Sequence, residues 1–245
     1  MLVDAHVHID HYADRLDEAL AQIAAQRIQT VCVAMDIPSY QRTLEIASRS
    51  PYLIPTFGVH PAKAQHYARN LSALDPYLER TPLIGEAGLD FFWVEDKASY
   101  PLQIEVFRYQ CQWAQRLSKP MNLHTKGAEV EILQTLKEFG LRGSIIHWYS
   151  GPPELMDDYL AQGCYFTLGV EILTSPSIQT IARQIPLDRI LLETDNPGGY
   201  EWLTGQIGMP SILLDVLEKV AEIKGVSPQV LESHLDENWQ AFRVQ

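Results

Sequence analysis

Short apolar runs alternate with helix-like stretches along the whole sequence, and this alternation limits the possible folds more than any other feature. Eight runs predict β-strands: Leu2–Val7, Thr30–Ala34, Leu53–Val59, Leu83–Ala87, Met121–His124, Ser144–His147, Cys164–Leu168 and Ile190–Glu193. The remaining stretches predict helices: Arg15–Gln26, Tyr40–Ser48, Pro101–Leu117, Ala128–Phe139, Pro153–Gln162, Ser177–Gln184 and Pro210–Lys224, followed by Pro228–His234 and Glu237–Phe242. Strands that alternate with helices pair in parallel through right-handed crossovers, which predicts the α/β class.

Eight such units in 245 residues match the size of a (β/α)8 barrel, with an open, doubly wound sheet as the alternative. An apolar content of 46% is enough for a sizeable core. The sequence contains no Gly/Ser-rich linker, repeat or low-complexity tract, so we expect one domain over residues 1–245. Pro152-Pro153 and Pro197-Gly198-Gly199 predict local loops.

The net charge is −12, from 19 basic and 31 acidic residues. An acidic surface repels a polyanion, so a nucleic-acid substrate must be held locally, by metals and a few cations. The three cysteines form no C-x-x-C pair, which favours reduced thiols in the cytoplasm. We expect neither a signal peptide nor a membrane span, because the first strand begins at once and no apolar run approaches ~20 residues.

Histidines and carboxylates gather in or after the predicted strands. His6 and His8 lie two apart on one strand and therefore share a face. Glu86 lies within an apolar strand, where a carboxylate is costly unless it is paired or metal-bound, and its neighbouring glycines indicate close approach of a ligand or backbone. Two further strands end in His124 and His147, and Asp195 follows the last one.

These six side chains lie near the carboxyl ends of strands one, four, five, six and eight, which would surround one mouth of a barrel. The set is His6, His8, Glu86, His124, His147 and Asp195. Four imidazoles and two carboxylates can hold two divalent ions, with Glu86 as the natural bridge. The donors suit zinc, manganese, iron, nickel or cobalt, and magnesium suits a carboxylate-rich half.

The sequence resembles the TatD family of metal-dependent hydrolases, within the amidohydrolase-like barrels. The matching motifs are Asp4-Ala5-His6-Val7-His8-Ile9-Asp10, Gly58-Val59-His60-Pro61, Gly85-Glu86-Ala87-Gly88-Leu89-Asp90, His147-Trp148-Tyr149-Ser150-Gly151 and Glu193-Thr194-Asp195-x-Pro197. Their order and spacing resemble the family's over nearly the whole chain, and jointly they are highly specific.

The resemblance implies that His6, His8 and Asp195 hold one metal, that His124 and His147 hold the other, and that Glu86 bridges them. It also implies that His60 lies near a substrate phosphate and that Asp195 acts as the general base. Members of this family are linked to DNA hydrolysis, often as exonucleases, so we expect a phosphodiesterase acting on a DNA end, specifically a 3′–5′ exodeoxyribonuclease.

The sequence departs from the family pattern around the expected active site. Lys126 stands where the family commonly has arginine, which keeps the charge but loses bidentate phosphate recognition. Trp148-Tyr149 replaces the usual Cys-Phe and either stacks on a base or packs in the core. Asp90 either orients a ligand or caps its loop, and Trp202 and Trp239 are expected to pack in the outer layer.

Two alternatives remain open. The same barrel can hydrolyse an ester, amide or small phosphoester, as in a D-aminoacyl-tRNA deacylase, because the same polarised water attacks a carbonyl. Related barrels often bridge their metals with a modified lysine on strand four, where this chain has Glu86. A non-catalytic metal-binding partner protein is the other alternative, although structural zinc sites are commonly cysteine-rich.

Overall fold

The structure, a computed structural model, describes residues 1–244. Its strands are β1 (Val3–Val7), β2 (Gln29–Val33), β3 (Leu53–Thr56), β4 (Ile84–Gly88), β5 (Met121–His124), β6 (Ile145–Ile146), β7 (Tyr165–Leu168) and β8 (Ile190–Leu192). Its α-helices are α1 (Leu16–Gln26), α2 (Ile37–Ala47), α3 (Asp75–Arg80), α4 (Tyr100–Leu117), α5 (Glu129–Phe139), α6 (Met156–Ala161), α7 (Pro176–Gln184), α8 (Gly198–Thr204), α9 (Ile212–Lys224) and α10 (Pro228–Arg243). Short 3-10 helices occupy several of the connections.

The strands follow one another in chain order, as β1-β2-β3 and as β4-β5-β6-β7-β8. Single parallel bridges extend both sheets, one from Phe57 to Ile84 of β4 and one from Val7 of β1 to Asn196 after β8. Strands that are neighbours in sequence thus pair within each sheet, and the two bridges follow β3 and β8, which is the order expected for a (β/α)8 barrel.

The chain divides into two compact units. The terminal unit comprises residues 1–32, 42–54 and 166–244, and the central unit comprises residues 33–41 and 55–165. The prediction of one domain over residues 1–245 stays a prediction.

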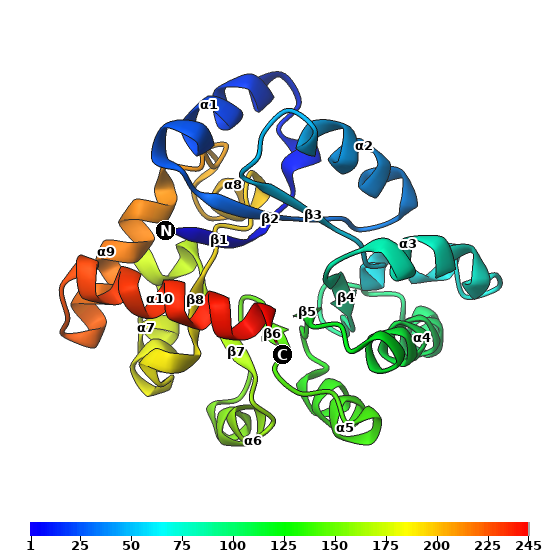
Figure 1. The fold of residues 1–245 in the computed structure, drawn as a ribbon. Helices are drawn as coiled ribbons and strands as arrows, with labels where there is room; N and C mark the ends of the chain where they lie inside the picture. Colours follow the sequence, from blue (N-terminus) through cyan, green and yellow to red (C-terminus); the bar gives the residue numbers. More distant parts are fainter. Residues whose placement is uncertain (245) are drawn as a thin grey trace. The chain divides into compact units, whose positions relative to one another are not determined.

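In the terminal unit, β1 pairs with β2 and β7 pairs with β8, both in parallel. The last helix, α10, packs on β1 and β8 (Figure 1). Its buried residues Leu231, Leu235, Trp239 and Phe242 recur every three or four positions and so form one apolar face. The Asn238 side chain donates hydrogen bonds of 2.8 Å to the carbonyls of Leu187 and Ile190, which fixes the helix against β8.

In the central unit, β4, β5 and β6 pair in parallel, with Gly88 opposite His124. Helix α4 packs along β4 (Figure 1). Its buried Gln110 accepts a hydrogen bond of 2.8 Å from the Val59 amide, which follows β3. This pairing sets Glu86, on β4, beside the side chain that ends β5.

The structure confirms the eight predicted strands and corrects several details. Helix α8 begins at Gly198, where a loop was predicted, because Pro197 supplies a helical φ at its start. Residues 228–243 form one helix rather than two. Trp239 is buried as predicted, but Trp202 is 61% exposed, and the prediction that it packs in the outer layer is wrong because α8 turns it toward solvent. Within residues 1–244, no helix is long and apolar enough to cross a membrane.

Candidate metal centre

The terminal unit brings together three of the predicted ligands. His6 lies in β1 and His8 follows it, and their ring centroids are 5.3 Å apart. Asp195 Oδ1 lies 3.7 Å from His6 Nε2 and 3.4 Å from His8 Nε2. The prediction that the two histidines share a face therefore agrees with this geometry, because both rings reach the same carboxylate.

Hydrogen bonds between β1 and the segment after β8 position this terminal group. The Asp195 amide donates to the His6 carbonyl, and the His8 amide donates to the Asn196 carbonyl, both at 2.9 Å. The buried Asp4 carboxylate accepts from the Thr194 amide at 3.0 Å and from its hydroxyl at 2.7 Å. Burial raises the pKa of Asp4 to about 7, although the hydrogen bonds from Thr194 oppose the shift.

Asp195 has a backbone φ of 52°, in the left-handed region that non-glycine residues rarely adopt. Such conformations persist where the surrounding structure imposes them, and they gather at functional sites. The turn directs the side chain of Asp195 back toward His6 and His8, rather than along the strand direction.

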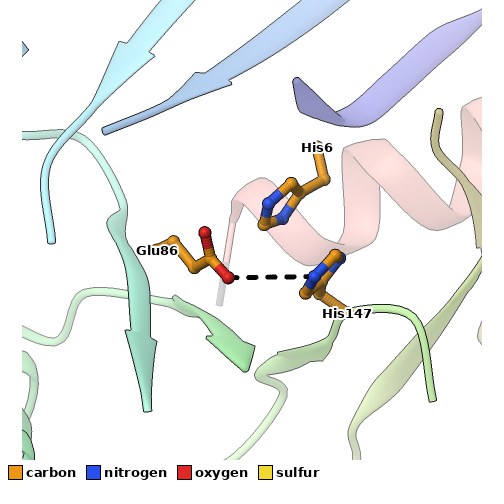
Figure 2. Close-up of side chains that lie close together, drawn as sticks. All are labelled: His6, Glu86 and His147. Atoms are coloured by element: carbon orange, nitrogen blue, oxygen red, sulfur yellow. Dashed lines mark ion pairs between the residues drawn. The ribbon is translucent and has the colours of Figure 1, made fainter. Parts of the chain in front are cut away.

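The central unit holds a second group around Glu86, whose side chain is 2% exposed. Its Oε1 lies 3.0 Å from His124 Nδ1, 3.5 Å from His60 Nε2 and 3.8 Å from His147 Nε2. Figure 2 shows the carboxylate of Glu86 directed at the His147 ring, with the ion pair dashed. Three imidazoles therefore surround one buried carboxylate oxygen.

His124 is oriented by two carboxylates. Its Nδ1 faces Glu86, and its Nε2 lies 2.9 Å from Asp90 Oδ2. Burial lowers the pKa of the His124 imidazole, but the hydrogen bonds to Asp90 and Glu86 outweigh burial and raise the pKa above its usual value. Asp90 thus fixes the ring so that Nδ1 is the atom directed at the site. Asp90 also caps its own loop, which confirms that interpretation, and its role in orienting a metal ligand stays a prediction.

Glycines allow the backbones around Glu86 to approach one another. A Cβ on Gly58 would lie 2.3 Å from the Glu86 carbonyl oxygen, and a Cβ on Gly88 would lie 2.0 Å from the His124 carbonyl oxygen. Gly88 also has a φ of +141°, which side chains rarely permit. The sequence prediction of close approach around Glu86 is confirmed for the backbone.

His60 differs from the other histidines of the central group. Its Nδ1 accepts a hydrogen bond from the Ala62 amide at 3.1 Å, so the neutral ring carries its proton on Nε2. The Nε2 directed at Glu86 is therefore a donor, and this arrangement suits a hydrogen bond to an anion better than a metal bond. The candidate central ligands are then Glu86, His124 and His147.

Lys126 lies after β5 and joins two neighbouring loops. Its Nζ donates to the Trp148 carbonyl at 2.9 Å and to the Ser150 hydroxyl at 2.7 Å. Trp148 is 9% exposed and Tyr149 is 2% exposed, so these two aromatic residues pack in the core and provide no exposed stacking surface. The core-packing alternative for this pair is the correct one.

The chemistry and spacing of both groups fit divalent ions. Metal bonds of about 2.1 Å at angles of 90–109° separate ligand atoms by roughly 3.0–3.4 Å. In each group one separation lies in this range, at 3.4 Å in the terminal group and 3.0 Å in the central group, and the other exceeds it by at most 0.4 Å, at 3.7 and 3.8 Å. Imidazole nitrogens and carboxylate oxygens are also the donors that zinc, manganese and related ions use.

The six predicted ligands thus fall into one group in each unit, and the prediction that Glu86 bridges two ions stays a prediction. Sequence reasoning did not identify the contact between Asp4 and Thr194 or the stacking of His11 on His8, whose ring centroids are 5.1 Å apart. The spacing Asp-x-His-x-His was the available signal for Asp4, since alternate strand residues share a face.

Comparisons with known proteins show which family and fold this chain resembles. The family model described as TatD related DNase matches residues 3–243. The uncharacterized metal-dependent hydrolase YabD of Bacillus subtilis is 30% identical, with all of both chains covered. The human deoxyribonuclease TATDN3 is 27% identical over 92% of this chain and 88% of its own.

Among solved structures, the TatD homologue YjjV of Escherichia coli superposes with a TM-score of 0.89, at 23% identity, over 98% of this chain and 97% of that one. This similarity confirms the predicted (β/α)8 barrel fold. Because the family model covers nearly the whole sequence, this chain belongs to the TatD-related DNase family of metal-dependent hydrolases.

Proposed function

We propose that this chain is a two-metal phosphodiesterase that removes nucleotides from the end of a DNA strand, with 3′–5′ polarity, in the cytoplasm. The relatives named as deoxyribonucleases support a phosphodiester substrate. Cys32, Cys111 and Cys164 are all buried and form no disulfide, which supports a reducing compartment.

One ion would bind to His6, His8 and Asp195, and the other to Glu86, His124 and His147. Divalent ions in such a site supply a nucleophilic oxygen at neutral pH and offset the negative charge of a phosphoryl group. The number of ions and their identity are part of the proposal.

The protein's own residues would complete the reaction. Asp195 is 23% exposed on its side chain, so it can take up a proton and pass it to solvent. His60 carries its proton on Nε2 and would donate it in a hydrogen bond to a phosphate oxygen. Lys126 adds a positive charge next to the end of β5.

The observation that carries this proposal is the pair of imidazole and carboxylate groups at strand ends. The ligand atoms of His6, His8 and Asp195 lie within 4.8 Å of one another, and so do those of His60, Glu86 and His124. A buried Glu86 surrounded by imidazoles is costly in an apolar core, and a divalent ion removes that cost. In (β/α)8 barrels, residues at these strand ends carry the chemistry.

A labelled oligonucleotide tests this function. Metal-stripped protein would be incubated with single-stranded DNA labelled at either end, with Mg²⁺, Mn²⁺ or Zn²⁺ added back. We expect metal-dependent shortening from the 3′ end, its loss in His124→Ala, and its retention in His234→Ala, whose side chain lies on α10. Folded, metal-loaded protein that leaves both labelled strands intact would refute the proposal.

A further inference from the structure

The loop that follows β4 carries two adjacent exposed aromatic side chains. Phe92 is 66% exposed and Trp93 is 55% exposed. Their ring centroids are 4.8 Å apart, in an edge-to-face arrangement. Two large aromatic side chains exposed side by side are unusual on a protein surface and often mark a place where another molecule binds.

The backbone of this loop is held in place. Asp90 Oδ1 accepts hydrogen bonds from the amides of Phe92 at 2.9 Å, Trp93 at 2.6 Å and Val94 at 3.3 Å. The Tyr100 hydroxyl donates to the Phe91 carbonyl at 3.0 Å and to the Val94 carbonyl at 3.2 Å. The two aromatic rings are therefore presented by an ordered turn, so a ligand that contacts them need not order the loop first.

The same turn contacts the central metal-binding group. The second oxygen of Asp90 lies 2.9 Å from His124 Nε2. The Phe91 amide donates to the Lys126 carbonyl at 2.8 Å, and a Cβ on Gly127 would lie 3.2 Å from Phe92 Cβ. A molecule stacked on Phe92 and Trp93 would therefore lie next to the loop that carries His124 and Lys126.

The charge of the chain favours a nucleobase as the occupant. A protein with a net charge of −12 gains little affinity from phosphates, which supply most of the affinity of basic nucleic-acid binders. Stacking on an aromatic ring adds about 1–3 kcal/mol per base, tolerates any base and requires no positive charge. Aromatic residues beside the candidate metal ligands would thus supply affinity for the nucleic-acid strand that the negatively charged surface does not provide.

We propose that Phe92 and Trp93 form a platform on which an unpaired base of the substrate strand stacks next to the scissile phosphodiester. This inference rests on the proposed nuclease function and adds the residues that recognise the base. The platform would make binding depend on the bases and only weakly on salt.

Binding measurements test the platform without cleavage. Fluorescence anisotropy in EDTA would compare an ordinary single-stranded decamer with one whose three 3′-terminal nucleotides are abasic. We expect wild-type protein to bind the ordinary strand about 10- to 100-fold more tightly, as stacking of one or two bases implies. We expect a salt slope no steeper than about −1.4, which corresponds to two phosphate contacts.

The variant Phe92→Ala/Trp93→Ala should lose the preference for the ordinary strand and keep its affinity for the abasic one. Ile104→Ala, at an exposed apolar position on α4, is the matched control and should behave as wild type. Melting temperatures of all three proteins should agree, because the removed side chains are exposed. Equal binding of the two strands by wild type, or an unchanged preference in the double variant, would overturn the platform.

Hydrolysis of the same two strands with metal present tests the platform and the proposed nuclease function independently of each other. Cleavage that is equally efficient in wild type and in the double variant would overturn the platform and leave the nuclease function standing. Base-dependent binding with no cleavage would refute the nuclease function and leave the platform standing. We expect kcat/KM on the ordinary strand to fall about 10- to 100-fold in the double variant and to stay unchanged on the abasic strand.

Discussion

The two candidate ligand groups differ in how far they are withdrawn from solvent. In the central group, the side chains of Glu86 and His147 are 2% and 4% exposed. In the terminal group, the side chain of His6 is 0% exposed, but those of His8 and Asp195 are 13% and 23% exposed. A carboxylate that is fully enclosed suits a permanent metal ligand, whereas a partly exposed one can exchange a proton with water. We therefore expect that the central group mainly holds an ion and that the terminal group also takes part in proton transfer.

The two groups are also built differently. Backbone hydrogen bonds between β1 and the segment after β8 place Asp195 beside His6. In the central group, a side chain, Asp90, orients His124. Side-chain substitutions near the central group should therefore disturb metal binding directly, and the predictions below test this contrast.

The largest effect is expected for Glu86→Gln. The amide removes the negative charge around which His60, His124 and His147 lie, so the central ion should be lost. Because a metal ion contributes several kcal/mol to a hydrolysis, kcat/KM should fall on the order of 10⁴-fold. Glu131→Gln, at an exposed position on α5, is the control. Metal-dependent hydrolysis by Glu86→Gln at the wild-type rate would refute the role of Glu86.

Asp195→Asn should lower kcat on the order of 10³-fold, because a general base contributes typically 10²- to 10⁴-fold. Unlike Glu86→Gln, this variant should keep the central ion, since Asp195 belongs to the terminal group. Metal content and kcat measured on one preparation would check both points. Loss of all bound metal would contradict the assignment of an independent ion to the central group.

Asp90→Asn should weaken binding of the central ion about 10- to 100-fold, the usual effect of removing a carboxylate that orients a metal-binding histidine. Titration of metal-stripped protein by calorimetry would measure the change. Asp96→Asn is a matched control, because Asp96 also caps a turn, by accepting from the Ala98 amide. Equal metal affinities of the two variants would show that Asp90 acts only on its loop.

The smallest effect is expected for Lys126→Ala. The variant loses hydrogen bonds to Trp148 and Ser150, which should lower the free energy of unfolding by about 1–2 kcal/mol. Loss of the positive charge should raise KM for an oligonucleotide roughly tenfold and leave kcat nearly unchanged. Lys126→Arg should restore KM. A fall in kcat without a change in KM would assign Lys126 a different role.

The strands and the clustering of the candidate ligands could be predicted from the sequence because both follow local rules. Alternating apolar strands and helices predict the fold class. A histidine that ends an apolar strand, such as His124, must lie at the carboxyl end of that strand, where (β/α)8 barrels carry their functional residues. Glu86 was predicted because a carboxylate inside an apolar strand is costly without a partner.

Other features depend on tertiary contacts that no local pattern reveals. The helix at Gly198 forms although two glycines begin it, so propensity alone predicted a loop. The exposure of Trp202 depends on how α8 turns, and the contact between Asp4 and Thr194 joins residues 190 positions apart. Phe92 and Trp93 could have been noticed as two large aromatic residues directly after the motif that ends in Asp90.

Metal content measured by mass spectrometry tests the central claim most directly. The account predicts two ions per wild-type chain, one in His6→Ala/His8→Ala and one in His124→Ala/His147→Ala, with melting curves showing that each variant is folded. The retained ion should differ in affinity between the two variants, because the two groups differ in burial. Fewer than two ions in wild-type protein, or no ion in either folded variant, would contradict the assignment of one ion to each group.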